Sequence, residues 1–173
     1  MNWTKRELLM RRLPAAADIL ALVPETGADG SNETVIYTAA GSRLTLRAAT
    51  EYILICLAGR EDKEIRLIRR SAARLLARRR NIILPILHGC VLAPLMMRPV
   101  EKRCGRLGYI NIARRPLIAR STRGTDLALQ SGAVIHSLWQ PPTVRKLMQE
   151  GRAVHYKLLL DVRRQLCSAE ELA

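Results

Sequence analysis

Arginine is the residue type whose spacing points most directly to chemistry in this sequence. Between Glu61 and Arg80, arginine recurs every four residues, at Arg66, Arg70, Arg74 and Arg78. The apolar residues of the same stretch also recur at helical spacing, at Ile65, Ile68, Ala72, Leu75 and Leu76. Because residues four apart share one face of a helix, the stretch is predicted to form a single helix that buries one face and lines the other with guanidinium groups.

A row of like charges on a helix has an energetic cost. Each like-charged pair four residues apart destabilises an isolated helix by ~0.2–0.5 kcal/mol, which an anionic partner would offset. Packing of the long arginine stems would also offset it, and the row would then be an ordinary solvated face. The predicted DNA-binding set also includes the basic residues around this row and a second group chosen from local charge alone: Arg60, Arg69, Arg79 and Arg80, and then Arg114, Arg115, Arg120 and Arg123.

The overall charge indicates the same kind of partner. Lys and Arg number 29 against 15 Asp and Glu, which gives a net charge of +14. Phosphates that approach such a surface gain Coulomb energy and release counterions, so nucleic acid is the first partner to expect, with solubility as the alternative role of the charge. The chain has no Phe, two Trp and four Tyr. Since proteins that bind RNA or single strands commonly stack bases on aromatic rings, this composition favours double-stranded DNA.

Sequence motifs of the common enzyme classes are missing. The chain contains no glycine-rich phosphate loop, no nucleophile elbow and no HExxH pair. Its histidines, His88, His136 and His155, are far apart and have no orienting carboxylate beside them in the sequence. The spacing of His88, Cys90 and Cys104 matches no common zinc pattern. We therefore expect no enzymatic activity, no metal or other cofactor, and no small-molecule substrate.

One cysteine lies in a setting that could activate it. Cys104 is surrounded by Lys102, Arg103 and Arg106, whose charges would lower its thiol pKa. A cysteine-dependent enzyme is therefore the weakest alternative, because an inert structural thiol explains a lone cysteine more simply.

The remaining composition favours a cytoplasmic protein. The four cysteines are scattered without a CxxC pair, as is typical of reduced thiols. The basic and apolar start of the chain resembles a signal peptide only superficially, because Asp18 interrupts it and no cleavage site precedes Pro24. The longest apolar run, Ile82 to Met97, contains two prolines and is shorter than the ~20 residues of a membrane-spanning helix.

Local patterns predict an α+β fold, a single domain in which antiparallel hairpins form a small sheet around a basic helix and a C-terminal helix. Thr4 to Leu13 is predicted to be a short helix capped by Thr4 and Glu7. The last helix is expected to begin at Thr143 and to bend or break at Gly151. The predicted strands are Ile19–Val23, Thr34–Thr38, Arg43–Arg47, Tyr52–Leu57, Asn81–Leu87, Gly108–Ala113, Pro116–Thr122, Thr125–Gln130 and Ala133–Trp139. Within the single domain, residues 1–17 form an N-terminal appendage, 18–156 the core and 157–173 the end of the last helix.

The order of these segments resembles the competence transcription factor (ComK) family, from about Ile19 to Tyr156. The residues that carry the resemblance are Leu22-Val23-Pro24-Glu25, Ala58-Gly59-Arg60, Ile83-Leu84-Pro85-Ile86, Cys104-Gly105 before the strand at Tyr109–Ile112, and the hairpin around Ser131-Gly132. The resemblance implies a bacterial transcription activator, associated with the nucleoid, that binds A/T-rich double-stranded DNA largely through the minor groove, as a dimer or higher oligomer. Only Arg60 matches a basic position of the family motif.

Two further functions fit the same composition. An RNA-binding or ribosome-associated protein would use an equally high positive charge. A protein-interaction adaptor would dock an acidic partner on the basic face, with Trp139 or Leu147 as its anchor.

Overall fold

The computed structural model describes residues 4–98 and 107–170 and contains two antiparallel sheets. The larger sheet has the strand order β3-β2-β1-β6-β5-β4, and the smaller has the order β7-β8-β9. The strands of the larger sheet are β1 (Ile19–Thr26), β2 (Asn32–Thr38), β3 (Arg43–Leu46), β4 (Leu84–Leu87), β5 (Cys90–Met96) and β6 (Leu107–Asn111). The strands of the smaller sheet are β7 (Leu117–Ser121), β8 (Gly124–Ala128) and β9 (Val134–Ser137). The α+β prediction is confirmed.

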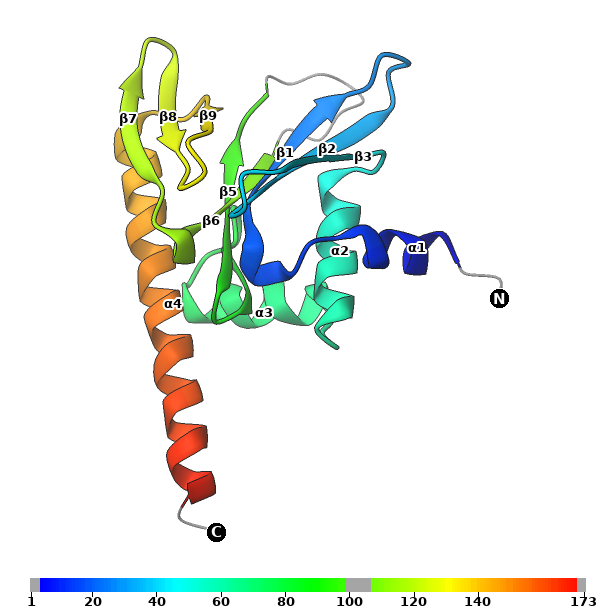
Figure 1. The fold of residues 1–173 in the computed structure, drawn as a ribbon. Coiled ribbons are helices and arrows are strands. Elements are labelled where there is room, and N and C mark those ends of the chain that lie inside the picture. The colour runs from blue at the N-terminus through cyan, green and yellow to red at the C-terminus, as the bar shows by residue number, and fades with distance from the viewer. Residues whose placement is uncertain (1–3, 99–106, 171–173) are drawn as a thin grey trace.

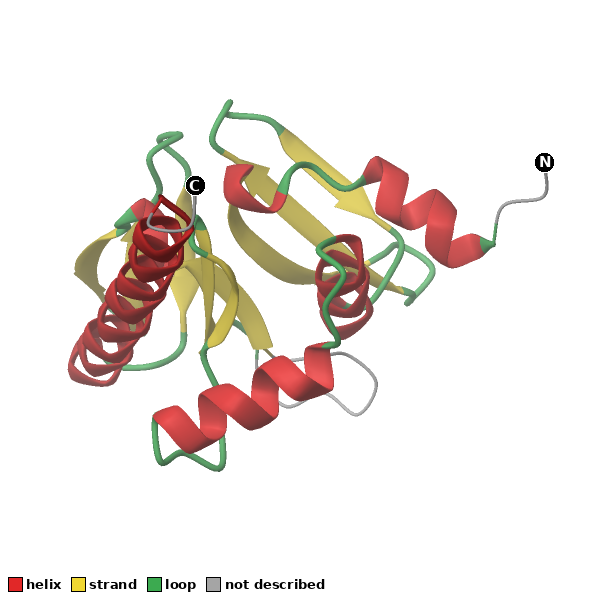
Figure 2. Cartoon of the chain, turned by 90° about the horizontal axis from the view of Figure 1, so that it is seen from below, coloured by secondary structure: helices red, strands yellow, loops and turns green. Residues whose placement is uncertain are grey.

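Helices flank the larger sheet on both sides, as Figures 1 and 2 show. The helical segments are α1 (Lys5–Arg12), η1 (Ala16–Asp18), α2 (Thr50–Arg60), α3 (Ile65–Leu75), η2 (Ile112–Arg114) and α4 (Pro141–Glu170). One core joins the sheet to α2 and to the buried start of α3, and the other joins it to the smaller sheet and the first half of α4. Along β5, Cys90 and Leu92 belong to the first core, whereas Val91, Ala93 and Leu95 belong to the second. This alternation is what a strand buried on both faces requires.

Two local predictions are confirmed in detail. The Thr4 side chain accepts a hydrogen bond from the backbone N–H of Glu7, and the Glu7 carboxylate accepts one from the backbone N–H of Thr4 at 2.7 Å. The Thr4 hydroxyl also donates to the Glu7 carboxylate, at 2.8 Å, and the backbone and hydroxyl donors of Thr4 together lower the pKa of Glu7. The hairpin around Ser131 and Gly132 joins β8 to β9, and Gly132 has the positive φ of 83° that its turn requires.

The strand prediction for Tyr52–Leu57 is wrong, because this segment lies inside helix α2. Its apolar run buries Ile53, Leu54 and Leu57, whose spacing fits a helix packed against a sheet. A short continuous apolar run has no periodicity that separates a buried strand from a buried helix. The sequence also missed β5, because the apolar run from Ile82 to Met97 folds back at Gly89 to form the β4-β5 hairpin.

The predicted helix Glu61–Arg80 is shorter in the structure, where α3 spans Ile65–Leu75. It ends in a Schellman motif, in which Ala77 has φ 48° and the N–H of Arg78 donates to the carbonyl of Ala73 at 3.0 Å. Arg78 therefore does not continue the arginine row of the helix. Leu75 is also not buried as predicted, since 45% of its surface is exposed.

Helix α4 continues through Gly151 without a break, contrary to the sequence prediction. A Cβ at Gly151 would lie 1.9 Å from Cδ1 of Ile112, so the glycine allows η2 to approach the helix closely. The glycine is thus explained by packing. The C-terminal half of α4 extends beyond both sheets (Figure 1).

Asn111, at the end of β6, connects three segments of the chain through side-chain hydrogen bonds. Its fully buried side-chain amide donates to the carbonyls of Ile19 at 2.8 Å and Gly89 at 3.0 Å. Its carbonyl oxygen accepts from the N–H groups of Val91 and Ala113, both at 3.1 Å. These four bonds hold η1, the β4-β5 turn and η2 together, and so fix the position of η2 beside α4.

Candidate nucleic-acid interface

Five of the predicted arginines form an exposed group on and just after α3, which we call the α3 surface: Arg66, Arg70, Arg74, Arg79 and Arg80. The first three share one helix face, because successive positions four apart differ by only about 40° around the axis. Among the residues that the structure describes, none of the five is in an ion pair with a carboxylate. The α3 surface therefore presents positive charge to solvent.

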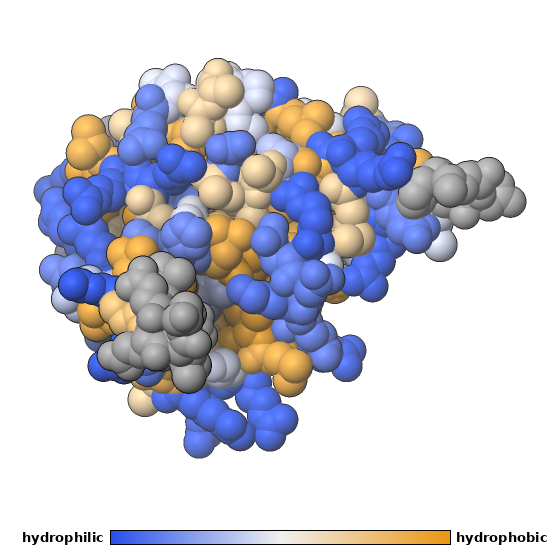
Figure 3. Space-filling model, turned by 60° about the horizontal axis from the view of Figure 1, so that its bottom comes forward, coloured by the Kyte–Doolittle hydropathy of each residue, from blue (hydrophilic) through white to orange (hydrophobic). Residues whose placement is uncertain are grey.

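The α3 surface also contains apolar side chains. Leu67 is 58% exposed and Leu75 is 45% exposed. Figure 3 shows hydrophilic residues with apolar areas between them on the underside of the molecule, where α3 and the end of α4 lie. A mixture of guanidinium groups and aliphatic side chains suits a surface that contacts both phosphates and the sugars between them.

Two arginines predicted for the same surface are neutralised within the chain. Arg69 forms a bidentate pair with Glu51, with Nη–Oε distances of 2.5 and 2.6 Å. Arg78 pairs with Glu150 of α4 at 2.6 Å. These side chains hold α3 to α2 and the end of α3 to α4, so they are positioned for stability.

Arg60 and Arg114 bind backbone carbonyl groups. Arg60 donates to the carbonyl oxygens of Leu13 at 2.7 Å and Pro14 at 2.5 Å, which fixes the segment after α1. Arg114 donates through Nε to the carbonyl of Ala17 at 2.8 Å. Since Arg60 is the one position matched to the family motif, its contacts here are those of a structural residue.

Of the remaining predicted arginines, Arg123 is exposed in the turn between β7 and β8, whereas Arg115 and Arg120 lie beside α4, close to basic residues that were not predicted from the sequence. Arg120 of β7 lines a hollow with Arg145 at the start of α4. Arg115, which follows η2, lines another with Arg152. Arg145 and Arg152 are seven residues apart, so they lie on the same face of the helix. This spacing in the sequence could have predicted that they share a surface. We call Arg115, Arg120, Arg145 and Arg152 the α4 surface.

The α3 and α4 surfaces lie on opposite sides of α4. Val154, Lys157, Leu158 and Asp161 line a groove against α3. The α4 residues that line the hollow beside η2 have the same spacing, but each lies two positions earlier in the sequence: Arg152, His155, Tyr156 and Leu159. A shift of two residues is a rotation of about 200°, so the predicted arginines do not form one continuous surface.

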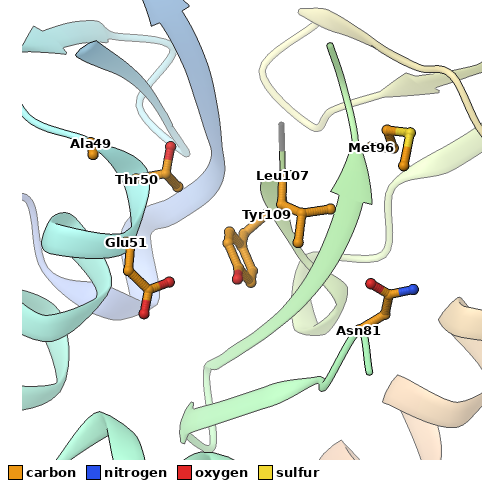
Figure 4. Close-up of a pocket in the computed structure, with 7 residues that line it drawn as sticks. All are labelled: Ala49, Thr50, Glu51, Asn81, Met96, Leu107 and Tyr109. Carbon is orange, nitrogen blue, oxygen red and sulfur yellow. The ribbon is translucent and has the colours of Figure 1, made fainter. Parts of the chain in front are cut away.

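A pocket of about 360 Å³ lies between the start of α2 and strands β5 and β6 (Figure 4). Glu51 and Asn81 lie on either side of Tyr109, and burial raises the pKa of that tyrosine. The carboxylate of Glu51 already binds Arg69. The described lining includes neither Cys nor His.

The structure reveals a carboxylate beside one histidine that was not visible in the sequence. Strand register places Asp126 opposite His136, with Oδ1 and Nδ1 2.8 Å apart. Cys90 is fully buried, and desolvation raises its thiol pKa to about 12. Within residues 4–98 and 107–170, no cluster of metal-ligating side chains occurs. The setting of Cys104, with Lys102, Arg103 and Arg106, lies outside the described residues.

One of the two anchors predicted for a protein-interaction adaptor, Leu147, is buried. Leu147 is 1% exposed and belongs to the second core, so it is not accessible to a partner. Trp139 is partly buried against the same core.

Comparisons of the chain with protein-family models, with curated proteins and with solved structures find no match. In the part of the chain that the structure describes, no helix combines the length and apolar character needed to cross a membrane.

Proposed function

We propose that this chain is a DNA-binding transcription regulator that contacts duplex phosphates through the α3 surface. One observation carries the proposal: Arg66, Arg70 and Arg74 share an exposed face and have no carboxylate partner among the described residues. Neighbouring Arg69 and Arg78 do have such partners. The chain thus leaves a specific subset of its guanidinium groups available to an external anion.

The length of the row suits a DNA strand. Eight residues of helix separate Arg66 from Arg74, which corresponds to about 12 Å. Each strand of B-DNA carries one phosphate per ~3.4 Å along the axis, so the row can span three to four phosphates. Arg79 and Arg80 extend the basic surface beyond the helix end.

The resemblance to competence transcription factors supports a preference for A/T-rich duplexes. Narrow A/T-rich minor grooves concentrate negative potential and accept inserted guanidinium groups. The exposed arginines would supply these groups, and on this resemblance the protein would act as a regulator on DNA in the bacterial cytoplasm. Recognition of A/T-rich DNA is therefore part of the proposal.

The test is a salt-titrated binding assay on A/T-rich and G/C-rich duplexes of equal length, with structured RNA as a competitor. We expect tighter binding to the A/T-rich duplex and a linear fall of log affinity with log salt. Equal affinity for both duplexes would contradict groove readout. Displacement of the duplex by an equal amount of RNA would favour the RNA-binding alternative.

A further inference from the structure

We propose that the hollow between η2 and α4 binds a single nucleotide, with its phosphate on Arg115 and Arg152 and its base against Tyr156. The hollow has a volume of about 450 Å³, and its lining consists of Ile112, Arg115, Arg152, His155, Tyr156 and Leu159. Small-ligand sites commonly have volumes of about 300–1,000 Å³, so one nucleotide fits and a duplex does not. The inference is independent of the α3 surface, which lies across α4.

Nitrogen-donor side chains from two separate elements converge on this hollow. Arg115 follows η2, whereas Arg152 and His155 belong to α4. None of the three is in an ion pair with a described carboxylate. Guanidinium groups bind phosphate oxygens through two parallel N–H donors, and the imidazole ring supplies a further donor. Among the described residues, the lining contains no acidic side chain that would repel an anion.

The other side of the hollow suits a planar, partly apolar group. Tyr156 is 64% exposed and Leu159 is 43% exposed, and both lie one turn or more beyond Arg152 on the same face of α4. A base that stacked on the tyrosine ring would cover apolar surface that the chain itself leaves in solvent. This combination of phosphate-binding and stacking groups distinguishes a nucleotide from a bare inorganic anion.

Three features of the fold fix the backbone around the hollow. Arg115 adopts the left-handed conformation with φ 46°, which is uncommon for a residue with a side chain. Gly151 allows Ile112 to lie directly on α4 and form the floor of the hollow. The bonds of Asn111 hold η2 in this position. The site is therefore held by the fold itself.

The phosphate and base could belong to a free nucleotide or to one nucleotide of a DNA strand. Equilibrium dialysis of the full chain with labelled AMP, a single-stranded tetranucleotide and inorganic phosphate separates these sources. We expect saturable one-to-one binding of AMP that is weakened about tenfold or more by Arg115→Ala and by Arg152→Ala, as expected for loss of a charged hydrogen bond. Binding of the tetranucleotide without AMP would assign the site to a DNA strand.

Two further variants test the assignment of the base and control for net charge. Tyr156→Ala should weaken AMP binding while leaving inorganic phosphate binding unchanged, and Tyr156→Phe should retain AMP binding. Lys157→Ala removes one charge from the opposite side of α4 and should leave AMP binding unchanged. Equal loss in Lys157→Ala and Arg152→Ala, or wild-type protein that binds neither AMP nor the tetranucleotide, would overturn the proposal.

The same assay separates this proposal from the proposed function. A variant with Arg66, Arg70 and Arg74 replaced by Ala should lose duplex affinity and retain AMP binding. Wild-type protein that binds duplex DNA but neither AMP nor the tetranucleotide would refute the nucleotide site alone.

Discussion

Replacing Arg70 and Arg74 together by Ala should reduce the salt dependence of duplex binding by about two units. Both side chains are exposed on α3 and have no carboxylate partner among the described residues, so each is available to neutralise one phosphate. The slope of log affinity against log salt is ~0.9 per neutralised phosphate, so two lost contacts reduce it by ~1.8.

The size of the effect is measurable over an ordinary salt range. If all five arginines of the α3 surface neutralise a phosphate, wild-type affinity falls about 500-fold between about 50 and 200 mM salt. With three contacts remaining, the same change in salt reduces the affinity of the double variant by only about 40-fold. Fluorescence anisotropy on a labelled A/T-rich duplex, at five or more salt concentrations, gives both slopes.

A matched control removes two positive charges at the far edge of the larger sheet. Arg43 and Arg47 each pair with a carboxylate, of Glu25 and Asp29 respectively, and belong to β3 or follow it directly. Strand β3 lies five strand intervals from β4, against which α3 packs, or about 24 Å. The Arg43→Ala/Arg47→Ala variant should keep the wild-type slope. An unchanged slope in the α3 variant, or an equal loss in both variants, would refute the assignment of the α3 surface.

Three further predictions concern the scaffold and its thiols. Asn111→Ala removes four hydrogen bonds, two buried and two part-buried, and should lower the free energy of unfolding by roughly 3 kcal/mol or more, measured by urea denaturation with an unchanged m-value. Gly151→Ala gains about 1 kcal/mol of helix propensity but displaces Ile112, so we expect a net destabilisation of ~1 kcal/mol. In the double variant with Ile112→Val, the loss of stability should be smaller than the sum of the two single losses. Additive losses would exclude the contact. The raised pKa of Cys90 leaves a thiolate fraction of about 10⁻⁴ at pH 8, so iodoacetamide should label exposed Cys167 and spare Cys90 until the protein unfolds, as peptide mapping would show; equal labelling rates would contradict its burial.

Elements specified by local interactions could be predicted from the sequence. The capping box of Thr4 and Glu7 and the turn at Gly132 involve residues within a few positions of one another. Their geometry therefore depends little on the remainder of the chain. Strand β4, which contains Pro85, lies at the edge of the larger sheet, where a proline removes no ladder hydrogen bond.

Elements specified by tertiary packing could not be predicted in the same way. Helix α2 has an apolar run that suits a buried strand equally well, and only its position across β1 and β2 decides the outcome. The pairing of Arg69 with Glu51 joins residues 18 positions apart on different helices. Because such pairing between helices is not encoded in local spacing, the sequence did not separate Arg69 from the exposed arginines around it.

Because several arginines are paired within the chain, its net charge overstates the positive charge available to an external partner. Arginines that hold helices together contribute to the net charge but offer little to an external phosphate, since their donors are already used. The two repulsive pairs that remain on α3, Arg66 with Arg70 and Arg70 with Arg74, cost about 0.4–1 kcal/mol together. Arg69 is neutralised by Glu51 of α2, whereas Arg66, Arg70 and Arg74 on the adjacent face have no carboxylate partner among the described residues. A basic protein that needed only solubility would have no reason to keep those charges in one row, whereas a phosphate backbone would relieve all of them at once.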